Sequence, residues 1–448
     1  MLSDPIAAIA TPPGRSGVAL IRLSGSDIHA VASSVLRPFR IEPFRTARLA
    51  EASHPSSGEP LDRVLYVTYR APHSYTGEDA VEISTHGGLL VPAEVLGATL
   101  AAGARLAGPG EFTRRALANG KLDLLQAEAV ADLVGATAPA QRRAALGQLD
   151  RGLSRRIGEL RQHLLDLESL LSYEIDFPDE DAGRVSEERV QGSTAALETQ
   201  LATLLRTSGE GERLREGALV VIAGRPNTGK SSLFNALLGT ERAIVTAMPG
   251  TTRDAVEAPV TCDGFPFRLI DTAGLGESED VVERMGVEVS HRYLRAADLV
   301  IFCVEAGRAV TDDERGFVRR LATQVVMVRT KLDLLDGRGE CDTGDVAVSA
   351  MTGEGLDVLR ATLARRAFTT LAARGDVETV VTRERHRAAL EEALNEVRAF
   401  REARHDGLDA VVAATHLRTA ATALEDLVGV VTPDEVLDRV FASFCVGK

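Results

Sequence analysis

A glycine-rich segment, GRPNTGKS at residues 224–231, has the residue types and spacing of a phosphate-binding loop. It directly follows the apolar run 219–222 and opens a segment with helical spacing, which is the context that the pattern GxxxxGK[ST] requires. In such a loop, backbone N–H groups surround phosphates at a helix N-terminus. We expect Lys230 to reach the β- and γ-phosphates and the Ser231 hydroxyl to ligate Mg²⁺. The segment therefore predicts binding of a nucleoside triphosphate.

Three more segments follow in the order and at the spacing of a guanine-nucleotide-binding domain. DTAG at 271–274 closes an apolar run, where an aspartate would approach Mg²⁺. TKLD at 330–333 resembles the guanine-reading pattern [NT]KxD, and SAM at 349–351 fits the loop that supports the base. The Asp333 carboxylate can accept two hydrogen bonds from the N1 and N2 donors of guanine. Adenine has no such pair of donors and would leave the carboxylate unpaired, so these motifs together predict GTP.

The catalytic part of this domain departs from the commoner patterns. Thr330 stands where asparagine is commoner, so we expect guanine specificity with weaker ties to the base and to the P-loop. Leu275 follows DTAG and cannot orient a water molecule as glutamine would. Thr252, in GTTRD, is the threonine expected to complete the Mg²⁺ shell. Asn227 and the intact segment 243–249 resemble GTPases that bind K⁺ in place of an arginine finger.

The predicted GTP site can be stated as a set. It comprises Asn227, Thr228, Gly229, Lys230, Ser231, Ser232, Thr246, Ala247, Met248, Pro249, Gly250, Thr251, Thr252, Asp271, Thr272, Ala273, Gly274, Thr330, Lys331, Leu332, Asp333, Ser349, Ala350 and Met351. Ser231 and Thr252 are the predicted Mg²⁺ ligands, and Lys230 has a catalytic role.

Lysine is scarce in this chain. Of 51 basic residues only four are lysine, namely Lys121, Lys230, Lys331 and Lys448. A sequence that uses arginine for its ordinary surface cations retains lysine where a compact ammonium is needed. Since two of the four lie in the nucleotide motifs, the other two are candidates for a second site. Alternatively, Lys121 caps a helix start and Lys448 is a frayed terminus.

The elements that would position these motifs fall into three parts. Residues 1–119 alternate short apolar runs, such as 18–23 and 64–69, with Gly/Pro turns, which predicts a small α+β domain. Residues 215–374 alternate strands and helices, which predicts a doubly wound parallel α/β sheet. Helical periodicity prevails in 120–214 and 375–448. The fold class is therefore an α/β G domain inserted in an all-α domain, preceded by the α+β domain.

Bulk composition limits the classes of protein. The net charge of −14 argues against a protein that coats nucleic acid by itself, so any RNA contact must be local or supplied by a partner. We find no signal peptide in the first residues and no apolar run long enough for a membrane span. The four scattered cysteines fit reduced thiols. We therefore expect a cytoplasmic protein without a membrane partner.

Several longer motifs resemble one family. They are ATPPGRSGV at 10–18, TGED at 76–79, PGEFT at 109–113, NGKLDLLQAE at 119–128 and FCVGK at 444–448. With the GTP motifs between them, they are similar to the MnmE (TrmE) family of tRNA-modification GTPases. The resemblance extends from the first ten residues to the last, and the family's order of domains is the one read above. Generic GTP motifs do not separate this family from other GTPases, whereas NGKLDLxQAEA and FC[IV]GK do.

The resemblance implies further site residues. The N-terminal domain would form a homodimer and bind a tetrahydrofolate carrying one carbon, through Arg22, Glu82, Lys121 and Lys448. Cys445 would serve the one-carbon chemistry, although a buried packing thiol beside Phe441 and Phe444 is the simpler alternative. Glu283 would position the hydrolytic water, unless it is an ordinary solvated helix residue. The implied K⁺ ligands are Asn227, Thr246, Met248 and Thr251, with Pro249 a departure that stiffens the loop.

The resemblance also implies a reaction. Together with the flavoprotein MnmG (GidA), which uses FAD and NADH in a heterotetrameric complex, the chain would add an aminomethyl or carboxymethylaminomethyl group at C5 of the wobble uridine of tRNA. Folate would supply the carbon, and glycine or ammonium the nitrogen. GTP hydrolysis would drive K⁺-dependent pairing of G domains.

Two other kinds of GTPase share parts of this pattern. Ribosome-assembly GTPases have similar P-loops but carry a basic RNA-binding domain, whereas residues 377–448 hold 9 Lys/Arg against 13 Asp/Glu. The run RERHR at 383–387 could contact tRNA, although it fits a solvated helix face better. A purely regulatory GTPase would leave Arg22, Lys121 and the C-terminal motif unexplained.

Overall fold

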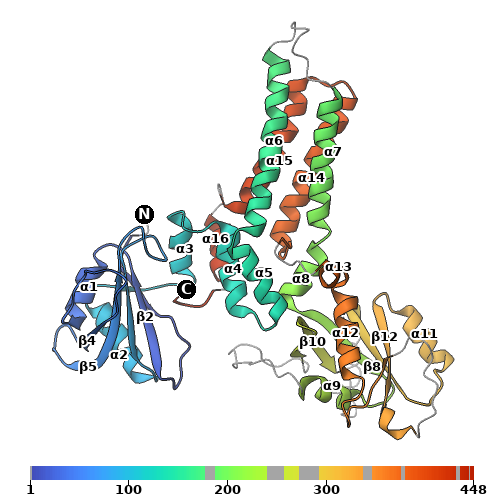
Figure 1. Ribbon diagram of the computed structural model, residues 1–448, viewed down its shortest axis with the longest axis horizontal. Coiled ribbons are helices and arrows are strands. Elements are labelled where there is room, and N and C mark those ends of the chain that lie inside the picture. Colours follow the sequence, from blue (N-terminus) through green and yellow to red (C-terminus); the bar gives the residue numbers. More distant parts are fainter. Residues whose placement is uncertain are drawn as a thin grey trace. The chain divides into compact units, whose positions relative to one another are not determined.

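The structure, a computed structural model, describes residues 3–176, 187–239, 257–271, 292–335, 346–374, 379–429, 434–442 and 444–447. The chain forms two compact units, residues 1–131 with 428–448 and residues 132–427. Figure 1 shows the elements of each unit. Among helices in these ranges, none has both the length and the apolarity to cross a bilayer. The three-part division into 1–119, 120–214 with 375–448, and 215–374 remains a prediction.

The first unit is built on a seven-stranded sheet in the order β3-β4-β5-β6-β2-β1-β7. The strands are β1 (Ile6–Ile9), β2 (Val18–Ser24), β3 (Leu36–Arg37), β4 (Arg48–Ser53), β5 (Pro60–Tyr69), β6 (Ala80–His86) and β7 (Arg105–Leu106). Helices α1 (Ile28–Val35) and α2 (Leu90–Ala101) pack their apolar sides on one face, against residues such as Ile21, Leu23 and Ile83. The strands predicted at 18–23 and 64–69 are confirmed.

The opposite face of this sheet carries polar side chains near the carboxyl end of β2. Because side chains alternate along a strand, Arg22 points away from the core that Ile21 and Leu23 enter. Helices α3 (Glu111–Ala118) and α16 (Asp434–Ala442) also belong to this unit, as does α4 (Leu124–Gly135) up to Ala131. Phe441 and Phe444 bury their rings against Ala127, which joins the C-terminal segment to α4 in one small core.

The second unit contains a six-stranded sheet in the order β13-β12-β11-β8-β10-β9. Its strands are β8 (Ala218–Gly224), β9 (Glu257–Cys262), β10 (Phe265–Asp271), β11 (Leu299–Glu305), β12 (Gln324–Thr330) and β13 (Val346–Ala347). All neighbouring pairs are parallel except β9 and β10. Helices α9 (Lys230–Gly239) and α12 (Leu356–Ala367) cover one face and α11 (Asp312–Arg320) the other, which confirms the predicted doubly wound α/β sheet.

Long helices form the rest of this unit (Figure 1). They are α6 (Gly152–Asp176), α7 (Glu187–Leu205), α14 (Glu384–His405) and α15 (Ala410–Val428). Leucines at 160, 164, 167 and 171 form the buried stripe expected from their helical spacing. Shorter helices α5 (Pro139–Leu149), α8 (Ser208–Glu216) and α13 (Thr369–Arg374) join the bundle to the sheet. There the buried Glu210 carboxylate accepts hydrogen bonds from the Thr370 and Leu371 amides.

Candidate functional site

The predicted phosphate loop joins the end of β8 to the start of α9. Gly224 has φ +145°, and a Cβ there would lie 2.6 Å from the Cys303 carbonyl oxygen, so the close approach requires glycine. Asn227 adopts the left-handed region at φ 61°, which asparagine tolerates better than most residues. The resulting turn places backbone amides at the N-terminus of α9, where anions bind.

The buried Lys230 ammonium lies within this loop. Its Nζ donates to the Arg225 carbonyl oxygen at 2.8 Å, and the Thr228 hydroxyl donates to the same oxygen at 2.8 Å. Asp271 ends β10, the parallel neighbour of β8, and is also buried. Ser231 is in the first turn of α9. The Asp271 carboxylate and the Ser231 hydroxyl therefore stand at the same edge of the sheet and suit a hard cation such as Mg²⁺.

The predicted guanine-reading loop begins where β12 ends. The Ser349 hydroxyl donates to Asp333 Oδ1 at 2.6 Å, so one carboxylate oxygen is fixed by the segment predicted to support the base. The Leu332 amide donates to the Val348 carbonyl oxygen, which holds these two segments together. The Thr330 hydroxyl donates to the Thr228 carbonyl oxygen at 2.6 Å, so this residue has one tie to the P-loop. The expected weakening of its ties to the base and the P-loop remains a prediction.

Not all predicted GTP-site residues can be placed. Thr246 to Thr252, Thr272 to Gly274 and Glu283 lie outside the described residues, and so does every predicted K⁺ ligand except Asn227. Of the remainder, Ser232 and Met351 are exposed, and Ala350 is half-buried. The structure thus brings the P-loop, Asp271 and the guanine-reading loop to one edge of the sheet.

A second candidate site lies on the open face of the N-terminal sheet. It is a pocket of about 120 Å³ lined by Arg22, Ser24, Tyr69, Tyr75, Thr76, Ala80, Glu82 and Phe112. Arg22 and Glu82 are cross-strand neighbours on β2 and β6, and Arg22 Nη2 lies 2.9 Å from Glu82 Oε1. The second carboxylate oxygen accepts a hydrogen bond from the Tyr69 hydroxyl at 3.1 Å. Both oxygens of Glu82 are therefore oriented by neighbours.

Aromatic rings form another wall of this pocket. The Arg22 guanidinium carbon lies 5.4 Å from the centre of the Tyr75 ring and 5.8 Å from that of Phe112, within the range of a cation–π contact. The Tyr75 hydroxyl hydrogen-bonds the Thr113 hydroxyl at 2.9 Å. Burial raises the pKa of Tyr75 above its ordinary value, although Thr113 and Arg22 oppose this shift, so the phenol is neutral at pH 7. The wall is flat and uncharged.

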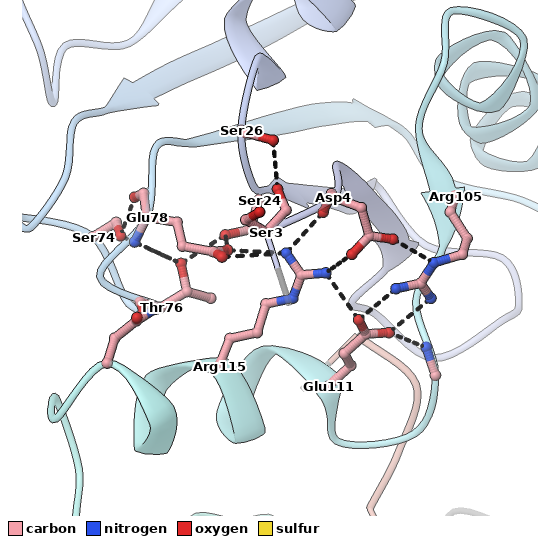
Figure 2. A network of polar contacts seen from close by, with 12 residues as sticks. Ser3, Asp4, Ser24, Ser26, Ser74, Thr76, Glu78, Arg105, Glu111 and Arg115 are labelled. Atoms are coloured by element: carbon pink, nitrogen blue, oxygen red, sulfur yellow. Dashed lines mark hydrogen bonds and ion pairs between the residues drawn. The ribbon is translucent and has the colours of Figure 1, made fainter. Parts of the chain in front are cut away.

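A polar network holds two hydroxyl groups of the pocket lining, those of Ser24 and Thr76 (Figure 2). Ser24 donates to Glu78 Oε2 at 2.8 Å and pairs with the Thr76 hydroxyl at 2.6 Å. The guanidinium of Arg115 on α3, which is 1% exposed, contacts Glu78 at 3.2 Å and Glu111 at 3.0 Å. Since a buried charge requires such partners, this cluster fixes the position of the two hydroxyls that line the pocket.

The C-terminal segment approaches this pocket within the same unit. The Gly447 carbonyl oxygen lies 3.4 Å from Arg22 Nη1, and Val446 forms a bridge with Pro109. The Gly110 amide donates to the Cys445 carbonyl oxygen at 3.4 Å. The Cys445 side chain is exposed, so the alternative of a buried packing thiol is wrong. The backbone next to Cys445 is therefore held close to the pocket.

The two lysines singled out by their scarcity are placed differently. Lys121 is exposed, and its ammonium donates to the Pro72 carbonyl oxygen at 3.0 Å. It contacts the turn that carries Tyr75 and Thr76 but does not line the pocket itself. Lys448 lies outside the described residues.

Six pocket residues were not predicted: Ser24, Tyr69, Tyr75, Thr76, Ala80 and Phe112. Two of them lie in motifs of the family resemblance, since Thr76 begins TGED and Phe112 is in PGEFT. Tyr69 and Tyr75 carry no comparable sequence signal. They come together because β5 ends beside β6 and the turn that follows returns toward α3.

Comparison with known proteins gives matches over the whole length of this chain. Residues 5–121 match the family model "GTP-binding protein TrmE N-terminus", and residues 124–445 match "MnmE helical domain". The proteins named tRNA modification GTPase MnmE from Moorella thermoacetica and Aquifex aeolicus are 43% and 38% identical, each over the full length of both chains. The G domain of the T. maritima FeoB iron transporter is 28% identical over 34% of this chain and 98% of that one, with a TM-score of 0.25. On the full-length matches, the chain belongs to the MnmE (TrmE) family of tRNA modification GTPases.

Proposed function

We propose that this tRNA modification GTPase uses a one-carbon tetrahydrofolate to add an aminomethyl or carboxymethylaminomethyl group at C5 of the tRNA wobble uridine. It would do so in a heterotetrameric complex with a flavoprotein of the MnmG kind, to which FAD and NADH belong. The single observation that best supports this proposal is the pocket around Arg22 and Glu82, which the C-terminal segment approaches through Gly447. GTP hydrolysis alone requires no such pocket.

The pocket residues fit one end of a folate. The carboxylate of Glu82 can accept hydrogen bonds from the ring N–H groups of a pterin, while Arg22 offers donors to carbonyl or carboxylate oxygens. The rings of Tyr75 and Phe112 provide a flat wall against which a planar heterocycle can stack. Lys121 and Lys448 would then bind the outer part of the molecule. The bound folate would supply the carbon that is transferred.

Cys445 is the proposed reactive residue of this site. Its thiol is exposed, and its backbone is tied to Gly110 at the start of α3. Phe112, two residues further along the chain, lines the pocket. A thiol held in such a position can approach a ligand in the pocket without disturbing the core formed by Phe441 and Phe444.

The GTP site would use two kinds of cation. Mg²⁺ use follows from the G domain, and the proposed ligands are Ser231 and Thr252, with Asp271 nearby. The Asn227 side chain would bind K⁺, together with Thr246, Met248 and Thr251, and the cation would neutralise charge that develops between the phosphates. Glu283 would hold the attacking water. Two G domains of a homodimer would pair during hydrolysis and separate afterwards.

The proposal can be tested by nucleoside analysis of tRNA from a strain that lacks this gene. We expect the C5-modified wobble uridine to disappear and to return when the wild-type gene or the Arg15→Gln control, which changes an exposed arginine, is supplied. Genes carrying Arg22→Gln or Cys445→Ser should fail to restore it. Unchanged nucleosides together with a ribosomal subunit defect would favour a ribosome-assembly GTPase. Full restoration by both variants would favour a purely regulatory GTPase.

A further inference from the structure

The first turn of α11 contains an unusually well buried carboxylate. Thr311 is the N-cap residue, and Glu314 completes a capping box, with Glu314 Oε2 accepting hydrogen bonds from the Thr311 amide at 2.9 Å and hydroxyl at 3.2 Å. Such a box uses only one carboxylate oxygen. Glu314 is nevertheless 4% exposed. Burial of a charge is costly unless it is paired, so its second oxygen requires a partner.

That second oxygen faces the P-loop. Glu314 Oε1 lies 3.1 Å from Arg225 Nε and also contacts the Arg308 guanidinium. Arg225 Nη2 donates to the Thr311 hydroxyl at 3.0 Å. The Arg225 side chain thus has two contacts with the start of α11. Burial acts to raise the pKa of Glu314, but the Thr311 and Arg308 hydrogen bonds outweigh it and hold the pKa below its ordinary value, so the anionic form persists.

The main chain of Arg225 lies at the phosphate site. Its carbonyl oxygen accepts hydrogen bonds from both the Lys230 ammonium and the Thr228 hydroxyl, each at 2.8 Å. The position of this carbonyl therefore sets where the P-loop lysine rests and how the loop curves. Because the Arg225 side chain is held by the start of α11, the carbonyl oxygen of the same residue is restrained as well.

The same group of contacts extends to the guanine side. Arg329 Nη1 donates to the Arg308 carbonyl oxygen at 2.6 Å. The next residue, Thr330, donates from its hydroxyl to the Thr228 carbonyl oxygen at 2.6 Å. The P-loop is therefore restrained at two points, by α11 through Arg225 and by the guanine-reading segment through Thr330.

We infer that Glu314 is a positioning residue for GTP hydrolysis, acting through Arg225 on the P-loop. This inference rests on the GTPase activity of the family and is independent of the folate proposal. A carboxylate that served only to cap α11 would need neither its depth of burial nor the contact with Arg225. The contacts of Glu314 are with Thr311, Arg308 and Arg225, so its effect is on how the loop is held.

The test is steady-state GTP hydrolysis by full-length Glu314→Gln. Glutamine also fits a capping box, so the helix start is kept, while the negative charge facing the two arginines is lost. We expect kcat/KM to fall about tenfold, the usual scale for weakening a charge-assisted hydrogen bond. Asp313→Asn is the matched control, because it removes an exposed acid from the same turn, and its kcat/KM should stay within about twofold of the parent.

A double variant separates positioning from folding. Arg225→Met removes the same connection between α11 and the P-loop. The double variant Arg225→Met/Glu314→Gln should therefore lose no more kcat/KM than the worse of the two single variants. Rates are divided by the fraction of protein that binds a fluorescent GDP analogue, which removes any loss caused by unfolding. If Glu314→Gln does not fold, Arg225→Met alone must still show the loss, since Arg225 is half-exposed. The inference would be overturned if Glu314→Gln had the same kcat/KM as Asp313→Asn. It would also be overturned if the losses of kcat/KM in the two single variants multiplied in the double variant.

Discussion

The guanidinium of Arg22 lies 3.4 Å from the backbone carbonyl oxygen of Gly447, a residue 425 positions later in the chain. This contact connects the candidate folate pocket with the segment that carries Cys445. It does not involve the GTP site, which is in the other unit of the structure. Variants of the two sites should therefore affect different measurements.

Gly447→Ala should weaken folate binding. Gly447 has φ +95°, and an added Cβ would lie 2.7 Å from the Ile9 carbonyl oxygen and 2.9 Å from the Ala10 Cα. The C-terminal segment must then move away from Arg22. We expect an affinity loss of about tenfold for a reduced folate in a fluorescence titration. Gly407→Ala is the control for left-handed strain alone, because Gly407 has φ +74° and open space around it. Equal folate binding by the two variants would contradict the prediction.

Asp333→Asn should change which nucleotide is bound. The Asp333 carboxylate, held by Ser349, is the predicted acceptor for the guanine N1 and N2 donors. Asparagine should weaken GTP binding by roughly 1–3 kcal/mol and favour xanthosine triphosphate, which has a carbonyl at C2. Competition with a fluorescent GDP analogue measures both affinities, with the exposed Asp312→Asn as control. An unchanged GTP affinity would mean that the guanine loop is elsewhere.

Hydrolysis should be faster in KCl than in NaCl at equal ionic strength. The reason is the proposed K⁺ site at Asn227. The charge of the bound cation would stabilise the transition state of hydrolysis. Asn227→Gly keeps the left-handed backbone at φ 61° but removes the amide, so it should abolish the difference between the salts. Equal wild-type rates in the two salts would exclude this role, and Pro249 would be the first residue to suspect.

Arg115→Met should destabilise the N-terminal unit. Arg115 is buried and contacts Asp4, Glu78 and Glu111, as Figure 2 shows, so its removal leaves carboxylates without their partner. We expect a loss of about 3–5 kcal/mol in the opening free energy of α3, measured by hydrogen exchange. Arg114→Met, which affects the exposed pair with Asp438, should cost less than about 1 kcal/mol. Equal losses of opening free energy in the Arg115 and Arg114 variants would show that the buried network contributes little to the stability of α3.

The same network predicts a direction of pH dependence. Burial opposes ionisation of Glu111, but hydrogen bonds from Arg105, the Gly108 amide and Arg115 hold its pKa below 4.5. A lowered pKa in the folded state contributes stability above the unfolded pKa that is lost as pH falls through the folded pKa. α3 should therefore lose protection on acidification below about pH 4.5, and Arg115→Met should reduce this dependence.

The two sites differ in how far the sequence predicted them. The P-loop and the parallel strands were predictable because each depends on a short local pattern, apolar runs followed by glycine and lysine. β9 was not predicted, since Pro259 argues against a strand and only its place at the sheet edge makes it acceptable. The pairing of Tyr69 with Glu82 joins β5 to β6 and depends on strand register. A single sequence contains no local signal for such a contact.

Calorimetric titration of the full-length protein with 5-formyltetrahydrofolate measures whether the pocket at Arg22 and Glu82 binds folate. We expect saturable binding at one site per chain, weakened at least about tenfold by Arg22→Gln and by Glu82→Gln, and unchanged by Arg15→Gln. GTP hydrolysis by all three variants should remain within about twofold of the wild-type rate, since surface changes remote from a site usually have small effects. Absence of binding, or binding that is the same in the Arg22 and Glu82 variants, would contradict the assignment of this pocket to folate.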